Sequence, residues 1–101
     1  MENKFVLDGF IKSDVETTVD GHVIFMLSSK TGDVVSPEGS VRPRYTHIKA
    51  KYFGGDKDIT SKIVAGNHVR ITGRLDSEQL LSKSNKIVYN KYIEVQGIEA
   101  I

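Results

Sequence analysis

The chain has 101 residues and no cysteine, and its 14 Lys and Arg residues nearly balance its 13 Asp and Glu residues, giving a net charge of +1. This length predicts a single domain over residues 1–101, and the lack of cysteine excludes disulfides and thiolate chemistry. No apolar run approaches the roughly 18–20 residues of a membrane span, and the N-terminus holds no signal-peptide core. We therefore expect a soluble, cytoplasmic protein with no membrane partner.

Apolar runs of period two predict five strands along the chain. They lie at residues 5–12, 22–28, 45–53, 67–75 and 87–98, and they are rich in Val, Ile, Tyr and Phe, as strands are. The pair Asp20-Gly21 predicts a hairpin turn before the second strand. Residues 30–44 hold both prolines, and residues 76–86 are polar. Both stretches are predicted to be long loops, which are usually functional or mobile.

One segment between the third and fourth strands follows a helical period instead. Ile59 and Ile63 are four residues apart, with Asp58 placed to cap the start of a short helix and Gly66 placed to end it. Five strands with one helix between strands three and four is the order of an all-β OB-fold, a small partly open barrel. Such barrels bind ligands mainly on the face of strands two and three, flanked by loops.

The small net charge hides an uneven distribution along the chain. Residues 1–41 carry a net charge of −4, residues 42–74 carry +6, and residues 75–101 carry −1. A polarised distribution creates a local field even when the total is small. The basic segment covers the predicted third and fourth strands, so the near-zero total does not exclude a nucleic-acid partner.

Alternation along these two strands predicts which side chains face outward. In the third strand Ile48, Ala50 and Tyr52 would face the core, and in the fourth Val69, Ile71, Gly73 and Leu75 would do so. The outward face of the third strand then carries Tyr45, His47, Lys49, Lys51 and Phe53. The outward face of the fourth carries His68, Arg70, Thr72 and Arg74.

Basic and aromatic side chains together are typical of single-strand binding. Lysine and arginine contact phosphates in a salt-dependent way, and aromatic rings stack on bases of any sequence. A protein that recognises double-stranded DNA needs a helix or a β-ribbon that enters the major groove, and the one short helix predicted here is poorly suited to that. The predicted phosphate contacts are Lys49, Lys51, Arg70 and Arg74 on the strands, with Arg42 and Arg44 from the loop. Tyr45, His47 and Phe53 are the predicted stacking or packing surfaces.

The same pattern also fits an ordinary solvated strand face. Charged side chains usually line the outside of a barrel, and strand lysines discourage edge-to-edge aggregation. Tyr45 could be a loop aromatic and Phe53 could cap the core. From the pattern alone, the solvated-face and binding-face interpretations have about equal weight.

Four segments together carry a family resemblance. Residues 3–11 place an Asn, an apolar run and a Gly before a variable loop, and residues 24–28 hold a central Phe. Residues 52–54 read Tyr-Phe-Gly, and residues 63–75 pass from a helix end into a strand of the form Val-x-Ile-x-Gly-x-Leu. In this order and spacing they resemble the bacterial and phage single-stranded DNA-binding protein family over nearly the whole chain.

The resemblance implies an OB-fold that binds single-stranded DNA without strong sequence preference, in replication, recombination or repair. It also implies no catalysis, hairpin loops that embrace the strand, and a homodimer or homotetramer. The chain departs from the family in having no tryptophan. His47 stands where a third-strand Trp is expected, Leu80 or Leu81 lies near the loop position, and Phe53 alone matches an aromatic position.

A second departure is that the chain stops at Ile101, directly after the fifth predicted strand. The family's cellular members continue into a tail with an acidic tip that recruits partners. Recruitment through such a tail is therefore not expected here. A tail-less chain without tryptophan favours a phage, prophage or plasmid member, or a replication-accessory relative, over a housekeeping member.

The sequence shows no pattern for catalysis, a cofactor or a metal. Its three histidines, at positions 22, 47 and 68, fall on three different predicted strands without ligand spacing. The carboxylates Asp56 and Asp58 suit a helix start better than acid–base chemistry. No Gly-rich phosphate loop precedes a helix, and no cleft is expected to shield a nucleophile. We expect no enzyme, no cofactor and no metal site.

Two other binding functions compete with single-strand binding. In the first, the chain is a protein-interaction OB module, a replication-accessory subunit whose basic patch faces an acidic protein and whose exposed Tyr and Phe are anchors. In the second it binds an oligosaccharide, as this fold also permits. The predicted face is basic, whereas sugar sites favour acidic and amide groups, so the second ranks last.

Overall fold

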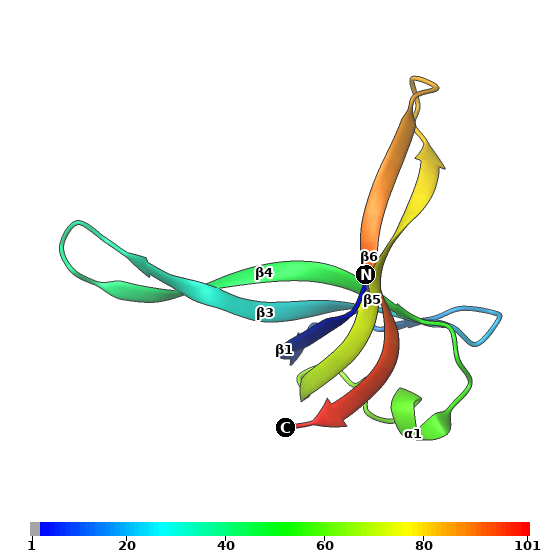
Figure 1. The fold of residues 1–101 in the computed structure, drawn as a ribbon, viewed down its shortest axis with the longest axis horizontal. Helices are drawn as coiled ribbons and strands as arrows, with labels where there is room; N and C mark the ends of the chain where they lie inside the picture. Colours follow the sequence, from blue (N-terminus) through cyan, green and yellow to red (C-terminus); the bar gives the residue numbers. More distant parts are fainter. Residues whose placement is uncertain (1–2) are drawn as a thin grey trace.

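The computed structural model describes residues 3–101, which form a closed all-β barrel with one short helix (Figure 1). The elements in chain order are β1 (Phe5–Ile11), β2 (Glu16–Thr17), β3 (Val23–Val35), β4 (Val41–Tyr52), α1 (Lys57–Thr60), β5 (His68–Leu81) and β6 (Ile87–Ala100). The sheet order is β1-β5-β6-β4-β3-β2, and β1 also pairs with β3, which closes five strands into a barrel. The all-β prediction and its five main strands are confirmed. No helix of this part of the chain is long and apolar enough to cross a membrane.

The helix differs from the prediction in position and length. It follows β4, because the two-residue strand β2, which the sequence pattern did not predict, adds one strand to the count. Asp56 caps it, with a side chain that accepts a hydrogen bond from the Asp58 N–H at 2.9 Å, so the expected cap at Asp58 was wrong. The helix ends at Thr60 with Ser61 as its C-terminal cap, well before Gly66. The chain then continues in turns that still bury Ile63 in the core.

The predicted long loops are mostly strand. β3 and β4 continue past the barrel as a two-stranded hairpin, and so do β5 and β6; Figure 1 shows both hairpins projecting from the barrel in different directions. The radius of gyration is 15.7 Å, above the roughly 13 Å of a compact domain this size, because of these projections. Apolar cross-strand pairs such as Val35–Val41 and Leu81–Ile87 reach almost to the tips.

The three hairpin ends share one five-residue turn. The turns are Thr18–His22, Ser36–Ser40 and Ser82–Lys86, and in each the first side-chain hydroxyl accepts a hydrogen bond from the fifth N–H at 3.1 Å. The fourth residue has a positive φ, which Gly21, Gly39 and Asn85 adopt. A hydroxyl at the first position and Gly or Asn at the fourth therefore end each hairpin.

The barrel core follows the predicted alternation. Val69, Ile71, Ala50 and Tyr52 are buried as expected, and they pack with side chains from β1, β3 and β6. The Tyr52 hydroxyl accepts a hydrogen bond from the Asp56 N–H at 3.1 Å, which ties the start of α1 to the end of β4. Ile63 and the partly buried Ile59 extend this core from the helical segment.

Gly9 allows the barrel to close at β1. The neighbouring residue Phe10 pairs with His68 of β5 on one side and with Ser28 of β3 on the other. A Cβ at Gly9 would lie 2.5 Å from the Ser28 carbonyl oxygen and 3.0 Å from the Leu27 side chain. Only a residue without a side chain permits this approach of β1 to β3.

We predict that Gly9→Ala destabilises the fold by about 1–3 kcal/mol, the usual cost of overpacking a tight site. The substitution forces the Ser28 carbonyl away and weakens the closure of β1 on β3. Thermal and urea unfolding followed by circular dichroism measure the change. Gly55→Ala is the matched control, because a Cβ there meets nothing within 4 Å. Equal stability of the two variants would contradict this account of barrel closure.

Candidate nucleic-acid interface

The outward side of β3 and β4 is a continuous surface, here called the β3–β4 outer face. The register places Ile24 opposite Lys51, Met26 opposite Lys49, Ser28 opposite His47, and Lys30 opposite Tyr45. Side chains directly opposite on antiparallel strands share one side of the sheet. The face consists of Ile24, Met26, Ser28, Lys30, Tyr45, His47, Lys49 and Lys51.

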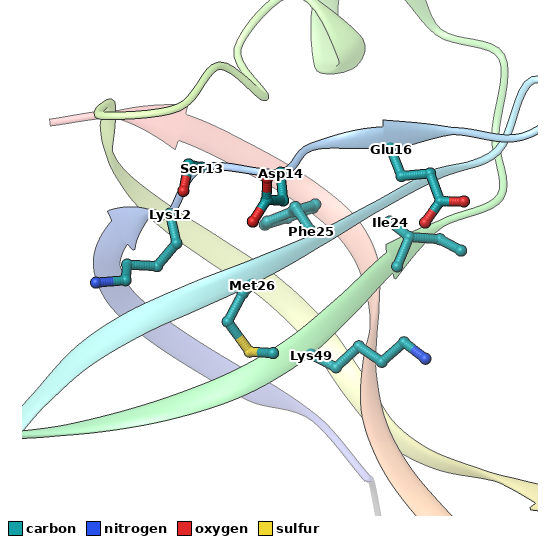
Figure 2. Close-up of a pocket in the computed structure, with 8 residues that line it drawn as sticks. All are labelled: Lys12, Ser13, Asp14, Glu16, Ile24, Phe25, Met26 and Lys49. Atoms are coloured by element: carbon teal, nitrogen blue, oxygen red, sulfur yellow. The ribbon is translucent and has the colours of Figure 1, made fainter.

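A pocket of about 490 Å³ lies between this face and the segment that joins β1 to β2 (Figure 2). Its lining residues are Lys12, Ser13, Asp14, Glu16, Ile24, Phe25, Met26 and Lys49. Figure 2 shows the ammonium ends of Lys12 and Lys49 extending to opposite sides, with Met26 between them. The volume is within the range of small-molecule sites, and the lining combines an apolar surface with the cations of Lys12 and Lys49 and the carboxylates of Asp14 and Glu16.

Lys49 and Lys51 share one carboxylate. Glu78 of β5 accepts a hydrogen bond from the Lys49 Nζ at 3.1 Å and another from the Lys51 Nζ at 2.6 Å. Lys51 was expected to be exposed on the outward face, but only 11% of its side chain is exposed. The cause is that Glu78 reaches it from the β5–β6 hairpin while its ammonium lies 4.6 Å from the centre of the Tyr92 ring.

The two arginines predicted on the fourth strand are also paired. Arg70 makes a two-pronged ion pair with Asp8 of β1, at 2.7 and 3.0 Å, and the Arg74 Nε lies 2.7 Å from Glu94 of β6. The hydrogen bond from Arg70 lowers the pKa of Asp8 below its usual value. The hydrogen bonds from Lys51 and then Lys49 likewise lower the pKa of Glu78.

These pairs change the meaning of the uneven charge along the sequence. Asp8 belongs to the acidic first third of the chain, and Glu78 and Glu94 belong to its last third. Each lies against a cation of the basic middle segment, so the fold neutralises much of the local field that the segment charges predicted. All four strand cations expected to contact phosphates already have an anionic partner.

Arg42 and Arg44 lie in a different setting. Both are exposed on the projecting part of β4, and neither forms an ion pair within residues 3–101. Alternation places them on the opposite side of the hairpin from Tyr45 and His47. The structure therefore separates these two arginines from the β3–β4 outer face rather than joining them to it.

The three predicted stacking residues have different surroundings. Tyr45 is 46% exposed, and His47 is also exposed on the same face. Phe53 is 42% exposed, but it packs edge-on against His22 at 5.0 Å and Tyr92 at 6.2 Å between ring centres. Tyr45 and His47 thus present free surface, whereas Phe53 is partly engaged in holding the end of β4 against β6.

Several features of this surface were not predicted. Met26, Ile24 and Lys12 contribute to the pocket, and Glu78 bridges the two lysines. Strand alternation could have placed Ile24 and Met26 opposite Lys51 and Lys49 once the hairpin register was known. Within the described residues, no group of three or more His, Cys, Asp or Glu side chains could hold a metal ion.

Comparison with solved structures identifies the barrel as an OB-fold shared with two single-stranded DNA-binding proteins. The small single-stranded DNA-binding protein of Streptomyces coelicolor is similar with a TM-score of 0.64 and 13% identity, over 97% of this chain and 93% of that one. The SSB protein of Plasmodium falciparum, solved in complex with single-stranded DNA, has a TM-score of 0.74 and 13% identity, over 100% of this chain and 96% of that one. No family model and no curated protein matches the sequence.

We predict that Tyr92 ionises at a higher pH than an ordinary tyrosine. Burial raises its pKa, since the charged form is poorly solvated there, and the nearby carboxylates of Asp76 and Glu94 add to the effect. The neutral form of Tyr92 therefore contributes to the free energy of unfolding. This contribution is fully present below the usual tyrosine pKa of about 10 and is lost as pH rises through the raised pKa. Ultraviolet titration should show a late tyrosinate component.

That late component should disappear in Tyr92→Phe and persist in Tyr89→Phe, because Tyr89 is exposed on the other side of the β5–β6 hairpin. A late component that survives Tyr92→Phe would show that another tyrosine is responsible. The two variants differ from wild type by the same hydroxyl group, so they form a matched pair.

Proposed function

We propose that the chain binds single-stranded DNA along the β3–β4 outer face, without strong sequence preference. The observation that carries this proposal is the arrangement of that face. It combines exposed Tyr45 and His47 with lysines and an apolar pocket, and it is bordered by the β1–β2 segment on one side and the β5–β6 hairpin on another. Two proteins with the same fold are single-stranded DNA-binding proteins, which supports this assignment.

In this function the side chains have distinct roles. Tyr45 and His47 stack on bases, and Phe53 supports the surface from the end of β4. Met26 and Ile24 provide an apolar floor for a base in the 490 Å³ pocket, with Lys12 and Lys49 beside its phosphate. Such binding would hold single strands during replication, recombination or repair, and it involves no catalytic step.

The unpaired arginines should contribute more to phosphate binding than the paired ones. Arg42 and Arg44 can meet a phosphate without giving up a partner. Arg70 and Arg74 would first have to leave Asp8 and Glu94. We therefore assign Arg42 and Arg44 to a part of the DNA that passes from the β3–β4 outer face around the projecting hairpin to its other side. We regard Arg70 and Arg74 mainly as links between strands β1, β5 and β6.

We predict that Arg42→Gln/Arg44→Gln lowers the affinity for oligo-dT more than Arg70→Gln/Arg74→Gln does, although both remove two positive charges. If each arginine meets one phosphate, the slope of log K against log salt becomes shallower by about 0.7 per arginine lost. Fluorescence anisotropy with labelled oligo-dT between about 50 and 200 mM salt measures both affinity and slope.

Two results would count against the proposed function. One is affinity no better than millimolar for the wild-type chain at low salt. The other is affinity that does not change with salt. Equal losses in the two double variants would leave DNA binding intact but remove the distinction between paired and unpaired arginines.

We propose further that two or more copies associate through the outer side of β1. Val6 is 57% exposed there, and Phe10 on the same side is 43% exposed and stacks on His68 at 4.3 Å between ring centres. Exposed apolar side chains grouped on one strand are typical of association surfaces. A second copy of this chain is the occupant that we assign to this surface.

Light scattering should give at least twice the 11.2 kDa mass of one chain for the wild type. We expect Val6→Lys to give a single-chain mass, because a lysine there charges the apolar patch. Val19→Lys, at a fully exposed turn position, should leave the mass unchanged. A monomeric wild type would refute this part of the proposal.

A further inference from the structure

The carboxylate of Glu78 lies between two lysines of the proposed DNA surface. Each of its oxygens meets a different ammonium group, Lys49 at 3.1 Å and Lys51 at 2.6 Å. Within residues 3–101 this is the one ion-pair cluster in which a single acidic group bridges two cations. Lys49 and Lys51 thus form a two-cation site that the protein fills with its own anion.

This bridge also holds the β5–β6 hairpin in place. β6 lies between β5 and β4 in the sheet, so Glu78 reaches across β6 to contact β4. Among the described residues, its two bonds are the side-chain hydrogen bonds that connect residues 77–91 to an element other than β5 or β6. Register pairs link β4 to β6 only at Ala50–Ile93 and Lys51–Glu94, next to the root of the hairpin. The outer hairpin is therefore free to move once this bridge opens.

A phosphodiester has the chemistry to replace this carboxylate. It carries one negative charge on two free oxygens bound to one atom, as a carboxylate does, and both groups form charge-assisted hydrogen bonds with lysine. The lowered pKa of Glu78 keeps it ionised at neutral pH, so that release requires a competing anion rather than a proton. Once released, Glu78 would lie on an exposed hairpin where water solvates it.

We propose that Glu78 occupies the position of a DNA phosphate between Lys49 and Lys51, and that a bound single strand displaces it and moves the β5–β6 hairpin away from β4. This proposal rests on the proposed function, because it names how that same face receives its ligand. Glu78 is then an internal competitor that lowers the affinity for DNA. Glu78 also lowers the salt dependence of that affinity, because Lys49, Lys51 and Glu78 together carry one positive charge, whereas the two lysines alone would carry two.

The first test compares Glu78→Gln with Asp20→Asn in oligo-dT titrations. Both substitutions raise the net charge by one, but Asp20 lies in an exposed turn and forms no ion pair within residues 3–101. We expect Glu78→Gln to bind roughly three- to tenfold more tightly than Asp20→Asn, with a salt slope steeper by about 0.7. Equal affinities for the two variants would overturn the proposal.

A double-mutant cycle shows whether Glu78 acts through the two lysines. In a Lys49→Gln/Lys51→Gln background, the gain from Glu78→Gln should vanish. A gain of the same size in that background would mean that Glu78 acts only through the overall field, and the competitor role would be wrong.

The second test follows the hairpin itself and does not depend on a folded Glu78 variant. Because the chain has no cysteine, spin labels can be attached at Ser84→Cys on the hairpin tip and Lys57→Cys beside the barrel. We expect oligo-dT to shift the distance distribution in the wild-type background. Binding without any shift would overturn the hairpin movement.

The labelled chain also separates the two proposals. Glu78→Gln without DNA should broaden the distance distribution, since the bridge is broken. If neither the wild type nor this variant binds oligo-dT, the proposed function fails, while broadening would still confirm that Glu78 holds the hairpin. An unchanged distribution in a folded Glu78→Gln chain would refute that holding role.

Discussion

The closure of the barrel by β1 determines where every other element lies. β1 pairs with β5 along most of its length and with β3 at Phe10 and Ile11, which joins the β3–β4 hairpin to the β5–β6 hairpin. The approach depends on Gly9, where a side chain would collide with the Ser28 carbonyl. Only the inner parts of the long strands then have partners on both sides, so their outer parts leave the barrel as two hairpins. One of these hairpins brings Glu78 against Lys49 and Lys51 of β4.

That arrangement also decides how the charges meet. The basic middle of the sequence forms β4 and the inner half of β5, and the neighbours that closure brings to them carry Asp8, Glu78 and Glu94. Exposed ion pairs such as Arg70–Asp8 contribute little to stability in water, so their main effect is on the local field. The surface is therefore less attractive to a polyanion at long range than the sequence charge predicted. In the proposed function, contact with DNA would therefore depend more on stacking and on local exchange of anions.

The sequence predicted the strands and the core well, because alternation depends only on the strand itself. Val69 and Ile71 are buried whatever strand lies beside them. The outer hairpins were mistaken for loops because Gly32, Pro43 and the polar residues 76–79 are typical of loops, whereas cross-strand pairs such as Val35–Val41 decide the structure. The shared turn of Thr18, Ser36 and Ser82 was visible in the sequence, with Gly or Asn three residues later. The contact between Glu78 and Lys51 was not visible in the sequence, because β4 and β5 are not neighbours in the sheet.

Burial of Lys51 explains why this site holds an anion in the free protein. Its ammonium lies over the Tyr92 ring with little exposure, and a charge so poorly solvated needs a partner. With Glu78 removed and no DNA bound, Lys51 would have to move toward water or remain unpaired. The same contact stabilises the free chain and, in the proposed function, would oppose the binding of a DNA strand. A ligand shifts an equilibrium only by its differential affinity for the two states. For the proposed displacement, a DNA strand would therefore have to bind the open hairpin more tightly than the closed one, by at least the free energy that the Glu78 bridge contributes.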